Sequence, residues 1–240
     1  MFLAINTEQI IGLSKGIGFG LLNTLWVSIF GTMVGLIIGL ICGLIRVQSI
    51  NPYDKKFVVF LKKFGNLLVK GYVTVFRGTP MILQALILFN IFTYFFELTA
   101  AINLASFITV SINTGAYLTE VIRNSIQSVD RGQLEAARAL GMSQRKAMMY
   151  VIFPQAIKIS FASIGNELII NIKDTSVLQI IGFQDVFSTI KGAMSNDLRI
   201  LFWYLVAGVI YLILTYGCSK ILTITEKRIG APVKEITSSN

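Results

Sequence analysis

The sequence contains no histidine and little cysteine, proline or acid. Its 240 residues include no His, two Cys, four Pro and only 12 Asp and Glu, against 21 Lys and Arg. The lack of histidine excludes His-based catalysis and His-based metal sites. Cys42 and Cys218 both lie within apolar runs, so no disulfide framework can be inferred from them. We therefore expect no catalytic residue, no metal site and no cofactor in this chain.

Charged residues are also too few for an ordinary soluble protein. They make up 14% of the chain and hydrophobic residues 54%, whereas soluble domains carry about 25% charged residues. This composition predicts an integral membrane protein, in contact with lipid. The net charge of +9 could indicate nucleic-acid binding. However, the basic residues flank apolar segments, where the positive-inside rule explains them, so we expect no nucleic-acid partner.

Five segments are apolar enough to cross a bilayer, which takes about 20 residues in a helix. The first carries a ladder in which every fourth residue from Gly31 to Gly43 is glycine. Such ladders let helices approach closely in lipid, and packing within one subunit or between subunits is equally compatible with this one. The predicted spans are residues 16–45, 79–96, 98–122, 156–181 and 200–219.

The distribution of Lys and Arg predicts the orientation of these spans. Seventeen of the 21 basic residues lie in three segments: seven in Arg46–Arg77, six in Arg123–Lys158 and four from Lys220 onward. Cytoplasmic loops carry such an excess. The sequence therefore predicts an all-α integral membrane protein of five transmembrane helices, with its N-terminus outside and its C-terminus in the cytoplasm. Residues 16–225 form a single domain in this prediction, and residues 226–240 form a cytoplasmic tail.

The segment from Tyr53 to Arg77, between the first two spans, is amphipathic. Its basic residues recur at seven-residue intervals, at Lys56, Lys63, Lys70 and Arg77. Residues spaced in this way share one helical face. We expect an amphipathic helix near the cytoplasmic surface, with its basic face toward water or lipid head groups. Pro80 removes a backbone donor and disfavours helix at Thr79, so the helix should be interrupted there.

Residues 131–154, between the third and fourth spans, are too highly charged to enter the bilayer. On either side of Gly141, residues 133–140 and 143–153 are rich in helix-forming residues. Glycine commonly follows a helix end, and Ser143 can cap the second helix. We expect a helix–glycine–helix elbow on the cytoplasmic side, and we use "elbow" below for residues 131–154.

The elbow closely resembles the EAA loop of the transmembrane subunits of ATP-binding-cassette (ABC) importers. In that loop Glu-Ala-Ala is followed after three residues by Gly and, after nine more, by Ile, any residue and Leu-Pro. The matching residues are Glu135, Ala136, Ala137, Gly141 and Pro154, with Val151 in place of Ile and Phe153 in place of Leu. The resemblance implies that these five residues couple the chain to a separate ATPase subunit by docking into its cleft. A cytoplasmic helical hairpin without a partner is the alternative.

The fourth predicted span holds several ionisable residues. Glu167 and Asp174 are seven residues apart and point the same way, whereas Lys173 is turned by about 100° from Asp174. A charge within a span costs about 2.5–3.5 kcal/mol on insertion scales and is a functional candidate. The two acids either face a functional cavity or form an internal salt bridge with Lys173. In the third span, Glu120 and Arg123 are three residues apart and can pair on one face.

Two further stretches resemble the polar-amino-acid branch of these permeases: Arg-Gly-Thr-Pro at 77–80, and Gly-Asn-Glu with Lys-Asp-Thr-Ser between 165 and 176. The resemblance implies that Glu167 and Asp174 face a central cavity and hold the amino group of the substrate. We include Asn166, beside the first acid, in the candidate substrate site. Thr79 is a candidate hydroxyl donor to the substrate carboxylate.

The chain has no Gly-x-x-x-x-Gly-Lys-Ser/Thr loop, so the energy for any transport must come from a partner. The resemblance implies a permease subunit of an ATP-driven importer that moves a polar amino acid into a bacterial cell across its inner membrane by alternating access. It also implies two ATPase subunits that bind ATP and magnesium, a second permease chain and an extracytoplasmic solute-binding protein. Alternatives are a permease for a quaternary amine or opine, and a non-transporting membrane anchor or assembly protein.

Overall fold

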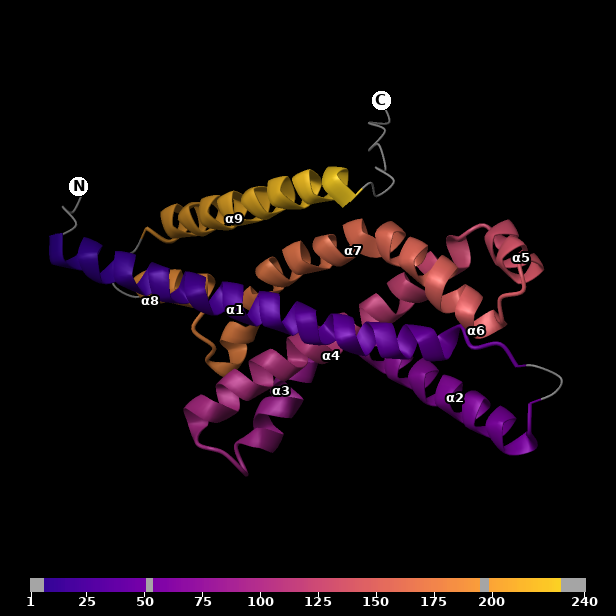
Figure 1. Ribbon diagram of the computed structural model, residues 1–240. Helices are drawn as coiled ribbons and strands as arrows, with labels where there is room; N and C mark the ends of the chain where they lie inside the picture. The colour runs from indigo at the N-terminus through magenta and orange to yellow at the C-terminus, as the bar shows by residue number, and fades with distance from the viewer. Residues whose placement is uncertain (1–6, 51–53, 195–198, 230–240) are drawn as a thin grey trace.

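The computed structural model describes residues 7–50, 54–194 and 199–229, and these ranges contain helices and no strands. The elements are α1 (Thr7–Arg46), α2 (Lys56–Gly78), α3 (Met81–Phe92), α4 (Leu98–Ser128), α5 (Arg131–Ala139), α6 (Gln144–Ala147), the π-helical turn η1 (Met148–Ile152), α7 (Phe153–Asp174), the 3₁₀ helix η2 (Thr175–Ile181), α8 (Val186–Met194) and α9 (Ile200–Ile229). Figure 1 shows α5, α6 and the start of α2 at one end of the molecule, and α8 with the start of α1 at the other. Most of the predicted tail, residues 230–240, lies outside the described residues.

Four of the described helical segments are long and apolar enough to cross a membrane. They are Ser14–Arg46, Leu98–Ser128, Gln144–Ile181 and Ile200–Ile229. A fifth crossing is possible only if α2 and α3 count together, and the two helices are bent by 107° at their junction. The expected span at 79–96 corresponds in the structure to α3 and the turn after it, the second part of this bent pair. Helix α3 has 12 residues, or about 18 Å, and is too short to cross alone.

The bend between α2 and α3 follows from Pro80, and the side-chain amides of Gln84 and Asn113 bind backbone carbonyl groups at the break. Within a membrane, such groups need a partner from the protein. The Gln84 Nε2 atom donates to the carbonyl oxygens of Phe76 (3.0 Å) and Thr79 (3.1 Å). Asn113 on α4 donates through Nδ2 to the Phe76 carbonyl (3.2 Å) and to Gln84 Oε1 (3.1 Å). These amides fix the broken helix against α4.

The glycine ladder of α1 packs on α4 of the same chain. A Cβ atom added at each of its glycines would lie 2.7–2.8 Å from a side-chain atom of α4. The pairs are Gly31 with Val110, Gly35 with Thr114, Gly39 with Leu118 and Gly43 with Ile122. Both series rise in steps of four in the same direction, so the two helices run parallel. The ladder therefore serves packing within one subunit.

A buried amide links α7 to this helix pair. Asn171 is 3% exposed, and its Nδ2 atom donates to Thr32 Oγ1 on α1 and Thr114 Oγ1 on α4, each at 2.8 Å. Interhelical hydrogen bonds of this kind stabilise helix association in lipid. The α1–α4 pair and α7 therefore meet at one polar junction.

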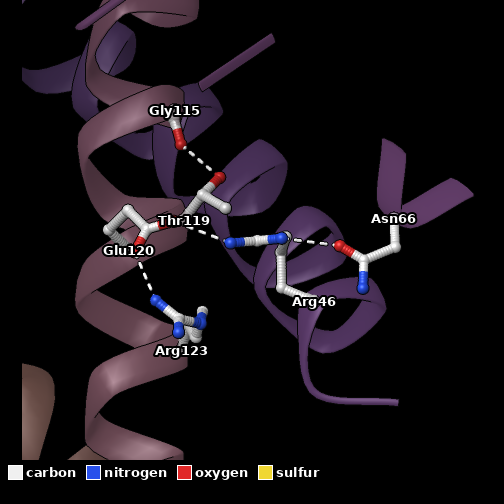
Figure 2. Close-up of polar contacts among 6 residues, drawn as sticks. All are labelled: Arg46, Asn66, Gly115, Thr119, Glu120 and Arg123. Atoms are coloured by element: carbon white, nitrogen blue, oxygen red, sulfur yellow. Dashed lines mark hydrogen bonds and ion pairs between the residues drawn. The ribbon is translucent and has the colours of Figure 1, made fainter. Parts of the chain in front are cut away.

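A charged cluster joins α1, α2 and α4 near the elbow end of α1 (Figure 2). Arg123 Nη1 donates to Glu120 Oε2 at 2.8 Å, so the predicted pair is confirmed. The other Glu120 oxygen lies 3.7 Å from Arg46 Nη2, and Arg46 Nη1 donates to Asn66 Oδ1 at 2.6 Å. The spacing along α4 predicted only the local pair, because the contacts with Arg46 and Asn66 depend on how three helices meet.

The segment after η2 contains the short helix α8, and its polar anchor, Asp185, is fully buried. Asp185 is 0% exposed; its carboxylate accepts the Ser188 N–H and the Tyr211 hydroxyl, both at 2.8 Å. Burial raises the pKa of Asp185, and these hydrogen bonds act in the opposite direction. The carboxylate thereby caps the first turn of α8 and ties it to α9.

We predict that the stability of the fold depends on the glycines of the ladder. Replacing Gly39 by alanine places a methyl group 2.7 Å from Leu118 Cβ and 3.0 Å from its backbone carbon. The helices must separate, and such overpacking costs about 1–3 kcal/mol. Gly208→Ala on α9 is the control, because its added Cβ has nothing within 4 Å. In thermal unfolding of the purified protein in detergent, G39A should melt at a lower temperature than G208A; equal melting temperatures would contradict the packing account.

Candidate functional site

The two short helices of the elbow begin at polar caps. Asp130 precedes α5, and its carboxylate accepts the Gly132 N–H at 2.6 Å. Ser143 precedes α6, and its hydroxyl oxygen accepts the Lys146 N–H at 3.4 Å. The predicted serine cap is therefore confirmed. Side-chain oxygens at this position pair backbone donors that the first helical turn leaves free.

The turn of the elbow favours glycine because its backbone is in the left-handed region. Gly141 has φ +83°, and a Cβ added there would meet nothing within 4 Å. Its N–H donates to the Arg138 carbonyl (2.9 Å), and the Met142 N–H donates to the Ala137 carbonyl (3.1 Å). This pair of bonds is the Schellman arrangement, which ends a helix at a left-handed residue. The glycine predicted to end the first helix does so.

The second arm of the elbow runs without a break into the fourth membrane segment. The sequence predicted a separate helix at 143–153, whereas the structure has α6, the π-helical turn η1 and α7 in direct succession. Pro154, in the first turn of α7, has no N–H to donate. A π-helical turn directly before it accommodates the missing bond. One continuous helical segment therefore joins the elbow to the fourth membrane segment.

Most of the residues that match the EAA loop are available to a partner. Ala137 is 5% exposed and faces the protein, whereas Glu135, Ala136, Gly141 and Pro154 are exposed. Sequence reasoning missed the large apolar residues of this surface, although apolar residues in a charged loop are a usable signal. Three of them are strongly exposed: Leu140 (86%), Met149 (70%) and Tyr150 (71%). A surface of this composition is typical of a protein interface.

A cavity of about 410 Å³ lies between the end of α4, the start of α5 and η1. Its lining combines apolar side chains with the charged start of the elbow: Ile126, Gln127, Val129, Asp130, Arg131, Leu134, Met148 and Ile152. No group of three or more Cys, Asp and Glu side chains within the described residues could hold a metal ion.

The two acids of the fourth span lie on α7 as expected, both half-buried, whereas Asn166 and Lys173 are exposed. Asp174 on α7 and Arg77 at the end of α2 both act electrostatically on Glu167. The ion pairs within 4.0 Å among the described residues involve Arg46, Lys62 and Arg123, and none joins Lys173 to either acid. The internal salt bridge considered from the sequence is therefore absent from the described part of the chain.

Arg77 is a candidate site residue that sequence reasoning overlooked. Its guanidinium carbon lies 5.0 Å from the centre of the Tyr117 ring on α4, a cation–π distance. Arg77 is exposed. The tetrapeptide that begins with Arg77 was the available signal, but the heptad pattern of α2 assigned this residue to the basic face.

Thr79 lies in the helix break, and its hydroxyl group is already hydrogen-bonded. It donates to the Val75 carbonyl at 2.8 Å and accepts from Gln84 Nε2 at 2.9 Å. No contact between Thr79 and Glu167 or Asp174 occurs among the described interactions. The geometry thus assigns Thr79 to the bend and leaves the exposed Arg77 guanidinium as the other candidate in this tetrapeptide.

Relatives of known name match about two thirds of this chain. The putative glutamine transport system permease protein GlnP of Rickettsia bellii is 37% identical over 158 residues, covering 66% of this chain and 72% of that protein. The L-cystine transport system permease protein TcyB of Bacillus subtilis is 38% identical over 160 residues, covering 66% and 68%. The glutamine transport system permease protein GlnP of Escherichia coli is 33% identical over 180 residues, covering 70% and 80%.

Solved structures confirm the fold. A crystal structure of an amino acid ABC transporter with histidines matches with a TM-score of 0.78 and 32% identity, over 94% of this chain and 100% of that one. The MetNI methionine ABC transporter, in inward-facing conformations, matches with a TM-score of 0.74 at 17% identity, over 93% and 99%. This second likeness concerns the fold alone.

The family match covers most of the chain. Residues 35–230 match the family described as binding-protein-dependent transport system inner membrane component. This range includes the elbow and the second to fifth predicted spans. It also includes the first predicted span from residue 35 onward. The chain therefore belongs to this family of inner-membrane permease components of ABC transporters, in which ATP hydrolysis takes place on a separate subunit.

Proposed function

We propose that this chain is the transmembrane permease subunit of an ATP-driven importer that moves a polar amino acid by alternating access. The observation that carries the proposal is the continuity of α6, η1 and α7: one helical segment joins the elbow to Glu167 and Asp174. The relatives named for glutamine and cystine support a polar amino acid as the substrate. Closure of two ATP-bound ATPase subunits moves the elbows, and α7 carries that movement to the acids.

The geometry favours a site for a zwitterion. Glu167 and Asp174 supply the negative charge that binds the substrate ammonium group. Arg77 replaces Thr79 as the candidate for the carboxylate, because its exposed guanidinium offers charge-assisted hydrogen bonds. Residues 16–225 form the single transmembrane domain of this proposal. The N-terminus lies outside, and the elbow side faces the cytoplasm.

A second permease chain, identical or related, completes the pathway. Asn166 and Lys173 are exposed within Gln144–Ile181, which is apolar enough to cross a membrane, and Arg77 is exposed in the α2–α3 pair, which passes that test only as a pair. Charged groups are expensive when they face lipid, so another protein surface or a water-filled path is expected beside them. A solute-binding protein delivers the substrate from the opposite side of the membrane.

The other candidate functions have less support. The non-transporting anchor disagrees with membership in a transport family. A quaternary amine needs the free faces of aromatic rings, and Arg77 already lies over the Tyr117 ring. An opine keeps some support from the nopaline transport system permease protein NocM of Agrobacterium fabrum, which is 33% identical over 168 residues. Opines are therefore included among the substrates of the uptake experiment described below.

We predict that Gly141 is essential for docking the ATPase. Gly141→Val forces a β-branched residue into a positive-φ conformation, which should distort the elbow. Gly141→Asn is the matched control, because asparagine tolerates this conformation. When the tagged chain is purified from its native membrane, wild type and G141N should bring ATPase activity and G141V should not. Equal recovery of ATPase activity with wild type, G141N and G141V would contradict the docking proposal. Recovery of no ATPase activity with wild type would also contradict it.

We predict that the two acids are required for transport and not for assembly. Loss of a charged hydrogen-bond partner costs about 1.5–3 kcal/mol, so Glu167→Gln and Asp174→Asn should each reduce uptake at least tenfold. The measurement is ATP-dependent uptake of radiolabelled glutamine, cystine and opines by the reconstituted complex. Glu97→Gln, at an exposed turn, is the control and should transport like wild type. Full uptake by both acid variants would exclude these acids from the substrate site.

A further inference from the structure

Helix α2 presents opposite faces to the protein and to its surroundings. Val69 and Val73 are each 7% exposed and lie on the face that packs against the body. On the opposite face, six large apolar side chains are 48–69% exposed: Phe57, Phe60, Leu61, Phe64, Leu67 and Leu68. Their spacing of three and four residues makes them one continuous apolar stripe. Nothing in the described chain covers this stripe.

A row of lysines follows one edge of the apolar stripe. Lys56, Lys63 and Lys70 are all exposed, and each successive pair is separated by about 10 Å along the helix. None of the three forms an ion pair with a described residue. Helix α2 itself contains no acid. Nearby, Asp54 is already paired with Lys62 at 2.6 Å. The charge of this row is therefore not neutralised within the described chain.

The first half of α2 lies at the elbow end of the molecule. Asn66, halfway along α2, accepts a hydrogen bond from Arg46, the last residue of α1. The first half of α2 therefore extends beyond the end of α1, on the elbow side of the molecule (Figure 1). Helices with an apolar face edged by lysines lie at the boundary between acyl chains and head groups. Lysines deeper along such a helix extend their ammonium groups back toward the surface.

We infer that α2 is a binding site for anionic phospholipids of the leaflet on the elbow side. The apolar stripe contacts acyl chains, and the ammonium groups of Lys56, Lys63 and Lys70 bind the phosphate groups. A second copy of this chain is a poorer occupant. In a symmetric dimer the same surface meets itself, and α2 offers no carboxylate to oppose its own lysines. A membrane with anionic head groups supplies both the apolar surface and the negative charge.

The test is the lipid selectivity of the purified complex, measured with spin-labelled phosphatidylglycerol and phosphatidylcholine. Wild type should prefer phosphatidylglycerol, and the preference should weaken at high salt. Each lysine near an anionic surface contributes about a fivefold preference, so the triple variant K56Q/K63Q/K70Q should lose most of the selectivity. The triple variant K56R/K63R/K70R keeps the charge and should retain it. K220Q/K227Q/R228Q removes three basic residues of α9 and serves as the control.

Two outcomes would overturn this inference. One is unchanged phosphatidylglycerol preference in K56Q/K63Q/K70Q. The other is an equal loss in the α9 control, which would mean that total positive charge decides the selectivity. The mass of each complex, measured by light scattering, is recorded in parallel. If the α2 variant falls apart into smaller complexes while its lipid preference is unchanged, a second copy covers the stripe and the lipid site is rejected.

Discussion

The close approach of α1 to α4 is the constraint on which the rest of the structure depends. Four glycines in steps of four bring the two helices together over the length of the ladder. In lipid, where hydrophobic burial does not drive helices together, such contact is a main source of association. The pair then provides fixed partners for other elements: Thr32 and Thr114 for Asn171 of α7, and Glu120 for Arg46 and Arg123. Because α1 and α4 run parallel, the C-terminal ends of both helices lie on the elbow side.

Against this fixed pair, α7 is the element suited to carry movement. It begins at the elbow, passes the polar junction at Asn171 and bears Glu167 and Asp174. The Schellman turn at Gly141 and the caps at Asp130 and Ser143 hold the turn and the two helix starts of the elbow by local hydrogen bonds. A partner that moves the elbow therefore moves a preformed unit. The π-helical turn before Pro154 is the place where the helical bonding along this segment is least regular.

Local features of this protein could be predicted from its sequence, and features that depend on several segments could not. The helical class, the Ser143 cap, the role of Gly141 and the Glu120–Arg123 pair all follow from residues within a few positions of one another. The interruption at Pro80 was also expected. Its 107° angle was not, because Gln84 and Asn113 help to set it from two different helices.

The candidate site, too, could be predicted only in part from the sequence. Both acids lie on α7, where their spacing predicted them, but the candidate role of Thr79 rested on its hydroxyl group alone, because the sequence does not show the hydrogen bonds of the bend. The Thr79 hydroxyl is hydrogen-bonded to the local backbone, whereas the Arg77 guanidinium is exposed and lies over the Tyr117 ring. Asp185 is fully buried, and one of its partners is Tyr211, 26 residues later in the sequence. Such partners become visible only when the helices are assembled.

The most direct measurement is amino acid accumulation by proteoliposomes containing this chain, its ATPase and its binding protein, with ATP supplied on one side at a time. Our account predicts that a polar amino acid moves, against its gradient, into the compartment that contains both ATP and the elbow. ATP on the opposite side should have no effect. A complex that hydrolyses ATP but accumulates no polar amino acid, or that accumulates it equally with ATP on either side, would contradict the account.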